Sequence, residues 1–192
     1  MSRLDMDRYR AFTDQPASST DHPIVVVGAG LAGATAARLL ADHGFDVVVL
    51  DKGQRVGGRS SRRRLDDVVI THGAAHLHEW PAWMNAWAEV EQDKGRAVTG
   101  DGHRLLNGPE TIAGWLEGID VLTSTTVTRI EQDGEVWSIH DEEGNRWQAS
   151  GVVVTAPLPQ LHRMMADAPE AWSSHPYDRP GRWCSLTKRR RL

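Results

Sequence analysis

The sequence has very little cysteine and no long apolar run. Cys184 is the single cysteine in 192 residues, which excludes an intramolecular disulfide and a paired-cysteine redox or zinc motif. No stretch approaches the roughly 20 apolar residues that span a bilayer, and residues 1–22 lack the apolar core of a signal peptide. We therefore expect a cytoplasmic protein without a membrane partner, whose redox chemistry has to come from a cofactor.

Basic residues are fewer than acidic ones, except near the end of the sequence. The formal net charge is -4, and residues 179–192 are basic without any acid, so the remainder is more acidic than this value suggests. Phosphate contacts to nucleic acid need Lys and Arg clustered on a folded face. The acidic composition of the remainder therefore argues against a nucleic-acid partner.

Residues 24–51 show the pattern of a β-α-β unit. Ile24–Val27 is an unbroken branched run, as expected for a strand buried on both faces of a parallel sheet. The alanine and leucine content of Leu31–Asp42 predicts a helix that His43-Gly44 ends, and Asp46–Leu50 predicts the next buried strand. This alternation is typical of an α/β protein.

The turn between the first strand and the helix carries the spacing GxGxxG, formed by Gly28, Gly30 and Gly33. The first glycine permits a tight turn, the second lets the backbone approach a pyrophosphate, and the third allows close packing of helix and strand. The helix N-terminus then presents free N–H groups to the phosphates. The predicted contacts come from the whole turn: Gly28, Ala29, Gly30, Leu31, Ala32 and Gly33.

Asp51 closes the second strand, where its carboxylate can accept hydrogen bonds from an adenosine ribose. The strand before the turn, the helix after it and this acid together predict a dinucleotide site rather than a chance glycine turn. An acid in place of an arginine disfavours a nucleotide that is phosphorylated at the ribose 2′ position. Lys52, which follows Asp51, is assigned to the same cofactor site.

A second glycine loop, QRVGGRSS at residues 54–61, follows the second strand directly. Its Gly57-Gly58 pair offers flexible backbone, and Arg59 offers a guanidinium for the pyrophosphate. The arrangement resembles the second dinucleotide motif of FAD enzymes of the amine oxidase and glutathione reductase type, which NAD-only Rossmann domains lack. The resemblance favours FAD as the cofactor, against the alternative of an ordinary basic loop that continues through residues 62–64.

The remaining patterns predict two helices, Pro81–Gln92 and Glu110–Leu116, and a series of short strands. The strands are Val121–Thr123, Val127–Gln132, Val136–His140 and Arg146–Ala149, of which the last three form an antiparallel meander. The run GVVVTAP, residues 151–157, then rejoins the parallel sheet. The expected fold class is α/β, a Rossmann-type FAD-binding fold with a parallel sheet and an inserted antiparallel β-meander.

Four aromatic and sulfur-containing residues mark one face of the first of these helices. They are Trp80, Trp83, Met84 and Trp87, and their spacing favours core packing over the stacking of a ligand.

A group of histidines has some of the spacing of a metal site. His72, His76 and His78 lie close together, but the nearest acid is Glu79 and the sequence holds no second ligand cluster. We therefore predict no metal, and no residue is nominated as catalytic.

Four stretches together resemble one branch of the flavin enzymes. They are VVVLDKGQRVGGRSSRRR, THGAAHLH, VTRIEQDGEVWSI and VVVTAPLPQL, within Pro23–Leu161, and they are similar to renalase-like FAD-dependent oxidoreductases of the amine oxidase superfamily. The resemblance implies that His72, Gly73 and Ala74 pass close to the flavin and that the backbone of Val127 meets the adenine. It also implies hydride transfer to oxygen from a small-molecule substrate, either a reduced nicotinamide-type compound or an amine.

Members of that family continue beyond the length of this sequence, so we expect a C-terminally incomplete product. Residues 1–22 are then a flexible arm, 23–178 an FAD-binding domain with a partial substrate region, and 179–192 a basic, unstructured tail. Incomplete enclosure of the flavin would impair turnover, and an open sheet edge would favour self-association. The alternative is a noncatalytic remnant that binds FAD or another nucleotide.

Overall fold

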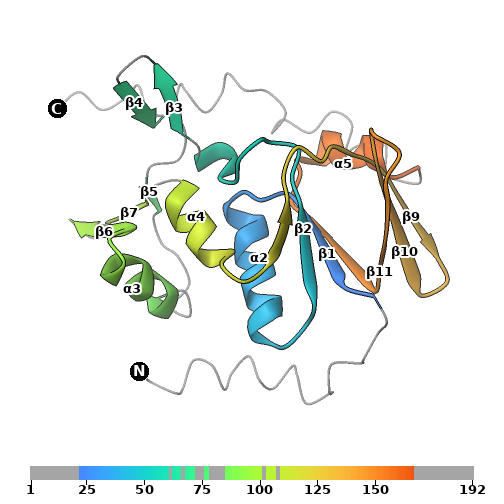
Figure 1. The fold of residues 1–192 in the computed structure, drawn as a ribbon, viewed down its shortest axis with the longest axis horizontal. Helices are drawn as coiled ribbons and strands as arrows, with labels where there is room; N and C mark the ends of the chain where they lie inside the picture. Colours follow the sequence, from blue (N-terminus) through green and yellow to red (C-terminus); the bar gives the residue numbers. More distant parts are fainter. Residues whose placement is uncertain are drawn as a thin grey trace.

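The computed structural model describes residues 22–60, 62–65, 68–71, 76–77, 85–100, 103–106 and 109–166. A four-stranded parallel sheet forms its centre, in the order β12-β1-β2-β8 (Figure 1). The strands are β1 (Ile24–Val27), β2 (Val47–Leu50), β8 (Asp120–Leu122) and β12 (Gly151–Val154). Because these strands are parallel, the residues that follow them gather at one edge of the sheet, where α/β proteins bind their ligands.

β1 lies between β2 and β12, and its side chains enter the core on both faces. Val25 and Val26 are fully buried, as predicted for a strand that is covered on both sides. Ile24 lies opposite Val47 of β2 and opposite Gly151 of β12. The predicted return of residues 151–157 to the parallel sheet is therefore confirmed.

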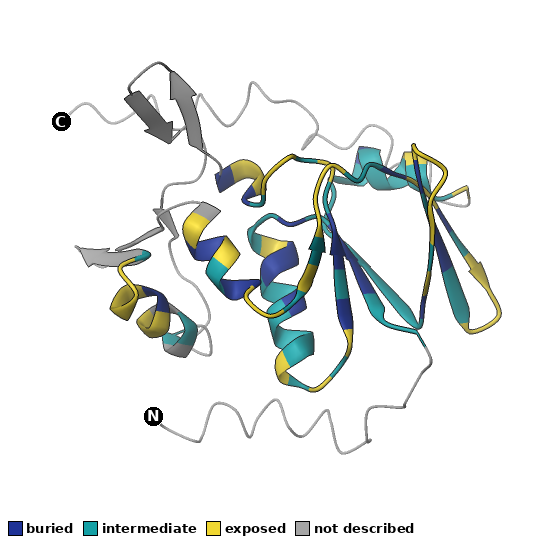
Figure 2. Ribbon diagram, viewed as in Figure 1, coloured by how far each residue is buried: buried dark blue, intermediate teal, exposed yellow. Residues whose placement is uncertain are grey.

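One face of the sheet is covered by α2 (Leu31–Asp42), with α4 (Pro109–Trp115) packed beside α2. The apolar cluster between these helices and the sheet includes Val26, Val49, Ala34, Ala37, Ile112 and Trp115. Figure 2 shows the buried residues concentrated in the sheet and in the adjoining parts of both helices. The small alanine side chains of α2 let this helix lie close to the strands.

Trp87 of α3 (Asn85–Asp93) packs against Trp115 of α4, with the two ring centroids 5.9 Å apart. Its ring is thus part of the apolar contact between α3 and the helices over the sheet. The core-packing interpretation holds for this member of the tryptophan stripe.

The antiparallel meander covers the other face of the sheet. It consists of β9 (Val127–Asp133), β10 (Val136–Asp141) and β11 (Arg146–Ala149), as predicted. Ile130 lies opposite Ile139, and both are buried against Leu50 of β2. α5 (Leu158–Met164) packs against β9. The parallel sheet therefore lies between a helical layer and a β layer.

The sequence did not predict the peripheral strands. β3 (Arg62–Leu65) and β4 (Val68–Thr71) pair as a hairpin, so the alternative of a basic loop is wrong for residues 62–64. A separate antiparallel sheet is formed by β5 (His76–Leu77), β7 (His103–Leu106) and β6 (Ala97–Gly100). The predicted strand at Val121–Thr123 is β8, which extends the parallel sheet by pairing with β2.

Several predictions concern residues outside the described ranges. They are residues 1–21 of the arm, the tail at 179–192, three members of the aromatic stripe (Trp80, Trp83 and Met84) and the segment His72, Gly73 and Ala74. The described part of the helix predicted at Pro81–Gln92 is α3. In the described ranges, no helix has the length and apolar character that crossing a bilayer demands.

Candidate dinucleotide-binding site

The turn after β1 has a backbone that only glycine can form. Gly28 has a φ of +110°, and its N–H donates a hydrogen bond to the carbonyl of Leu50 over 2.7 Å. A Cβ added to Gly33 would lie 1.7 Å from the carbonyl oxygen of Gly28, so no other residue fits there. The close packing of helix and strand that was predicted at Gly33 is thus visible in the backbone itself.

α2 begins directly after this turn, and its first turn is free of competing acceptors. Gly30 is the N-cap, and neither a capping side chain nor an acidic residue is present in the first turn. The first N–H groups of a helix have no intrahelical partner and favour an anion. Ala29 is fully buried, whereas Ala32 is exposed.

Asp51 joins the end of β2 to the glycine turn. One carboxylate oxygen accepts the N–H of Ala29 over 2.5 Å, and the other accepts the N–H of Gly53 over 2.6 Å. Each oxygen keeps a further lone pair with which it can accept a ribose hydroxyl. The residue predicted as a ribose ligand therefore also holds the turn in place, which the sequence did not indicate.

The second glycine loop packs against the first. The N–H of Gly57 donates to the carbonyl of Ala29 over 2.9 Å. A Cβ added to Gly58, whose φ is +49°, would lie 3.0 Å from the Cα of Gly30. Two motifs that were predicted separately therefore lie in backbone contact, at glycines that carry no side chain.

The basic residues predicted for this site lie at its periphery. Arg59 is exposed on the short 3-10 helix η1 (Gly58–Ser60). The ammonium of Lys52 donates to the side-chain oxygen of Gln160 on α5 over 3.3 Å. Arg59 thus follows Gly58, which contacts Gly30 of the turn, whereas Lys52 is directed to α5. The contact of both side chains with a cofactor stays a prediction.

Val127 begins β9 and is buried against Leu50 at the end of β2. Nearby, the N–H of Thr125 donates to the carbonyl of Asp51 over 2.9 Å. Because the side chain of Val127 is in the core, only its backbone can meet an adenine, as the resemblance implies. The flavin-proximal segment predicted at residues 72–74 lies outside the described residues.

Thr155 is a residue of this site that the sequence analysis missed. It follows β12, and its N–H and its hydroxyl both donate to the carbonyl of Val27, over 3.0 and 3.1 Å. The hydroxyl oxygen would lie 2.5 Å from a Cβ added to Gly28. The available signal was a hydroxyl residue directly after an unbroken apolar strand, at the edge where the other site residues lie.

The described residues fit the diphosphate part of FAD. The surface between Gly30 and Gly58 carries no Cβ, and the first turn of α2 faces it without a cap. Asp51 stands at the carboxyl end of the neighbouring strand. A cofactor bound here would be held by backbone N–H groups at its phosphates and by a carboxylate at its ribose.

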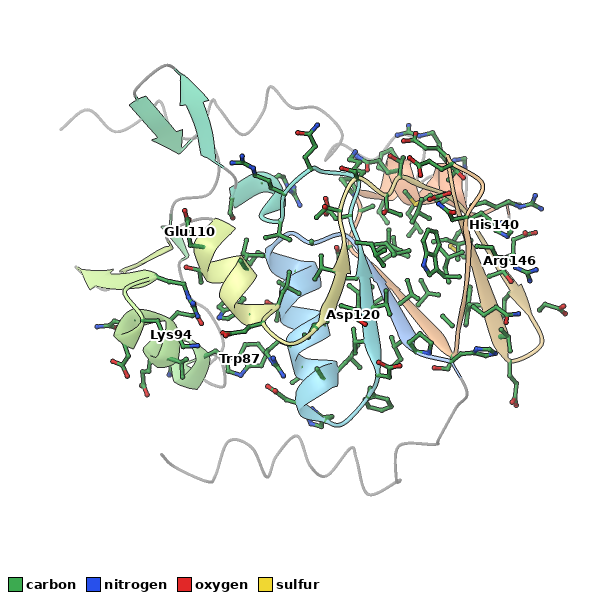
Figure 3. All side chains as sticks on the ribbon, in the orientation of Figure 1. Trp87, Lys94, Glu110, Asp120, His140 and Arg146 are labelled. Atoms are coloured by element: carbon green, nitrogen blue, oxygen red, sulfur yellow. The ribbon has the colours of Figure 1, made fainter. Side chains whose placement is uncertain are left out.

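A buried ion pair lies away from the glycine turn, at the contact between α3 and α4. Glu91 is 2% exposed and accepts two hydrogen bonds from Arg96, over 2.5 and 2.9 Å. The hydrogen bond to Glu91 raises the pKa of Arg96. Hydrogen bonding to Lys94, together with the charges of Lys94 and Arg96, lowers the pKa of Glu117. Figure 3 labels Trp87 on α3 and Lys94, which directly follows this helix.

A second perturbed carboxylate belongs to the meander. Asp141 accepts hydrogen bonds from the N–H groups of Glu143 and Asn145 and from the side chain of Asn145. Burial raises the pKa of Asp141, but these bonds and a backbone bond from Gly144 outweigh it and lower the pKa below its ordinary value. Among the described residues, no group of three metal-ligating side chains is assembled at Asp141 or elsewhere.

Two family models match this chain. Residues 26–90 match an NAD(P)-binding Rossmann-like domain, and residues 93–179 match the flavin containing amine oxidoreductase family. The second match spans α4, the meander, β12 and α5. The matched ranges therefore include both glycine loops, Asp51, Val127 and Thr155.

Curated relatives are similar over part of their length. Pseudooxynicotine dehydrogenase of Pseudomonas sp is 40% identical over 73 residues, which is 38% of this chain and 14% of that protein. Amine oxidase [flavin-containing] A of Canis lupus familiaris is 49% identical over 55 residues, 28% of this chain and 10% of that protein. The matched region is thus less than a fifth of either relative.

A solved structure shares the fold. A putrescine oxidase bound to putrescine superposes with a TM-score of 0.63 at 13% identity, over 80% of this chain and 62% of that one. The parallel sheet, its glycine turn and the separate antiparallel sheet define a Rossmann-like nucleotide-binding fold of the kind found in FAD-dependent oxidases. The family matches and the relatives make this chain similar, over part of its length, to flavin-containing amine oxidoreductases, and they support FAD as the cofactor.

Proposed function

We propose that this chain is the FAD-binding part of an oxidoreductase that takes hydride from an amine or from a reduced nicotinamide-type compound. The observation that carries the proposal is the contact between the two glycine loops, closed by the hydrogen bond from Gly57 to Ala29. FAD, when bound, supplies the two-electron acceptor and passes the electrons to oxygen.

The residues of this chain have three tasks in the proposed function. The backbone of the turn at Gly28–Gly33 and the start of α2 bind the diphosphate. Asp51 orients the ribose while it holds the turn through Ala29. The backbone at Val127 borders the adenine, because this residue lies beside the end of β2.

The substrate class follows from two separate arguments. Relatives named as an amine oxidase and as a putrescine oxidase support an amine. The resemblance of residues 47–64 and 152–161 to renalase-like enzymes supports a reduced nicotinamide-type compound. A small-molecule donor of hydride is common to both.

The test has two steps. The chain is purified, supplied with FAD and freed of unbound cofactor, and its visible absorption spectrum is measured. Peroxide production is then followed with putrescine and with NADH as probes. Retained flavin absorption together with peroxide from either probe supports the proposal, and the more active probe identifies the substrate class.

A second candidate is nucleotide binding without turnover. It is favoured by the fact that the described contacts of the site all concern the nucleotide part of FAD. Bound flavin without peroxide from either probe would support this candidate. A chain that retained no flavin after reconstitution would contradict the oxidoreductase proposal and the binding of FAD by the second candidate.

A further inference from the structure

Thr155 and the glycine turn belong to segments that are far apart in the sequence and adjacent in the sheet. Val154, the last residue of β12, lies opposite Val27, the last residue of β1, so Thr155 is level with Gly28. The hydroxyl donates to the carbonyl of Val27 across a separation of 128 residues. This contact connects the fourth strand of the sheet directly to the start of the turn.

The hydroxyl also reaches the first turn of α2. Its oxygen would lie 2.5 Å from a Cβ at Gly28 and 3.2 Å from a Cβ at Gly33. It therefore occupies the space that the two missing side chains leave between the end of β1 and the helix. A methyl group in its place would lose the hydrogen bond to Val27, and at 3.1 Å it would stand closer to that carbonyl oxygen than the about 3.5 Å at which non-bonded carbon atoms pack, so it would push the end of β1 away.

We propose that Thr155 is a positioning residue for the cofactor, because its hydroxyl sets the distance between the end of β1 and the N-terminus of α2. This inference rests on the proposed binding of FAD. The N–H groups at the start of α2 bind the diphosphate only when they stand at the correct distance from the turn. Thr155 contributes to affinity through the turn, without touching the cofactor itself.

The test compares Thr155→Val, which keeps the shape but replaces the hydroxyl by a methyl group, with Thr155→Ser, which keeps the hydroxyl. FAD is titrated into each apoprotein, and the quenching of flavin fluorescence gives the dissociation constant. We expect Thr155→Val to weaken FAD binding by about tenfold, the effect of one lost polar contact. Thr155→Ser should stay within about twofold of the parent, because the hydrogen bond to Val27 survives.

Thr111→Val is the matched control for general destabilisation. Thr111 is fully buried, and its hydroxyl also donates to a backbone carbonyl, that of Arg96, away from the glycine turn. This variant should lower the melting temperature and leave the FAD affinity of the folded protein unchanged. A loss of affinity in Thr111→Val equal to that in Thr155→Val would overturn the positioning role.

Amide hydrogen exchange in the apoprotein separates this inference from the proposed function. In Thr155→Val, the N–H groups of Gly28 and Ala34 should exchange faster than in the parent, while that of Val49 in β2 should not. A parent chain that bound no FAD would overturn the proposed function, and the exchange rates would still decide the role of Thr155. The positioning role of Thr155 would be overturned if the N–H groups of Gly28 and Ala34 exchanged in Thr155→Val as slowly as in the parent. It would also be overturned if this variant bound FAD as tightly as the parent.

Discussion

The carboxylate of Asp51 accepts the N–H of Ala29, a residue 22 positions earlier in the chain, over 2.5 Å. The end of β2 is thereby bonded to the turn that follows β1. A residue with the sequence signature of a ribose ligand is at the same time a support of the phosphate-binding turn, and its replacement should affect both functions.

Replacing Asp51 by Ala should weaken FAD binding by at least tenfold, because hydrogen bonds to a charged acceptor contribute about 1.5 to 3 kcal/mol each. Asp51→Asn should fall between this variant and the parent, since its amide keeps one acceptor oxygen for two N–H donors. Fluorescence titration of the apoproteins with FAD measures both. Asp120→Ala is the control, because Asp120 is an exposed carboxylate on the neighbouring strand β8. Equal affinity in Asp51→Ala and the parent would refute the adenosine assignment.

Gly33→Ala should abolish FAD binding and destabilise the fold. The added Cβ would lie 1.7 Å from the carbonyl oxygen of Gly28, and backbone atoms cannot move aside as a flexible side chain can. We expect a cost of about 3 kcal/mol or more in the free energy of unfolding, measured by urea denaturation. In the control Gly151→Ala, the new Cβ would lie 3.8 Å from Ile24, an ordinary contact, so its stability should be close to that of the parent.

The ion pair between Glu91 and Arg96 should respond unequally to the loss of either partner. Arg96→Met leaves a buried carboxylate without its partner, and such losses cost about 3 kcal/mol or more. Glu91→Gln should cost less, because the amide still accepts a hydrogen bond and the guanidinium is partly exposed. Urea denaturation measures both, and Lys94→Met is the control, since Lys94 pairs with Glu117 at the surface. Equal free energies of unfolding for Arg96→Met and Lys94→Met would show that the ion pair between Glu91 and Arg96 does not stabilise the fold.

Asp141 should give the stability of the protein a pH dependence in the acid range. Its pKa is lowered in the folded state, so the stabilisation is fully present above the unfolded pKa of about 3.9 and disappears as the pH falls through the lower, folded pKa. Asp141→Asn cannot titrate, so the difference in unfolding free energy between parent and variant should be constant near neutrality and shrink below about pH 4.

Urea denaturation at a series of pH values measures this difference. Glu142→Gln is the control, because Glu142 is an exposed neighbour in the same turn. If the difference in unfolding free energy between the parent and Asp141→Asn stayed constant down to the lowest pH at which the protein folds, Asp141 would not be the source of the pH dependence.

The local part of the fold could be predicted from the sequence, because its signals lie within a few residues of each other. The branched run at β1, the glycine spacing and the closing Asp51 together indicate the β-α-β unit. The turn residues at Gly134 and Gly144, both with positive φ, mark the meander in the same way. These patterns need no knowledge of distant partners.

The remaining features depend on partners that are distant in the sequence. β3 is rich in arginine and therefore looked like a solvated loop, although β4 pairs with it. β8 is only three residues long, so the sequence indicated a strand there, outside the meander, but not its pairing with β2. Thr155 acquires its role only because β12 returns to lie beside β1; the apolar run before it indicates the return to the sheet, but not which strand is its neighbour.

The pairing of β12 with β1 also determines when the glycine turn at Gly28–Gly33 can reach its final shape during synthesis. A ribosome releases the N-terminal part first, so β1, β2 and the glycine turn emerge long before residues 151–155. Until then one side of β1 has no strand partner, and the carbonyl of Val27 lacks both donors that Thr155 provides. Contacts between segments so distant in the sequence form slowly, because a long loop must close first. The glycine turn, although synthesised early, can therefore reach its final shape only after β12 is available, and until then one edge of β1 has no strand partner.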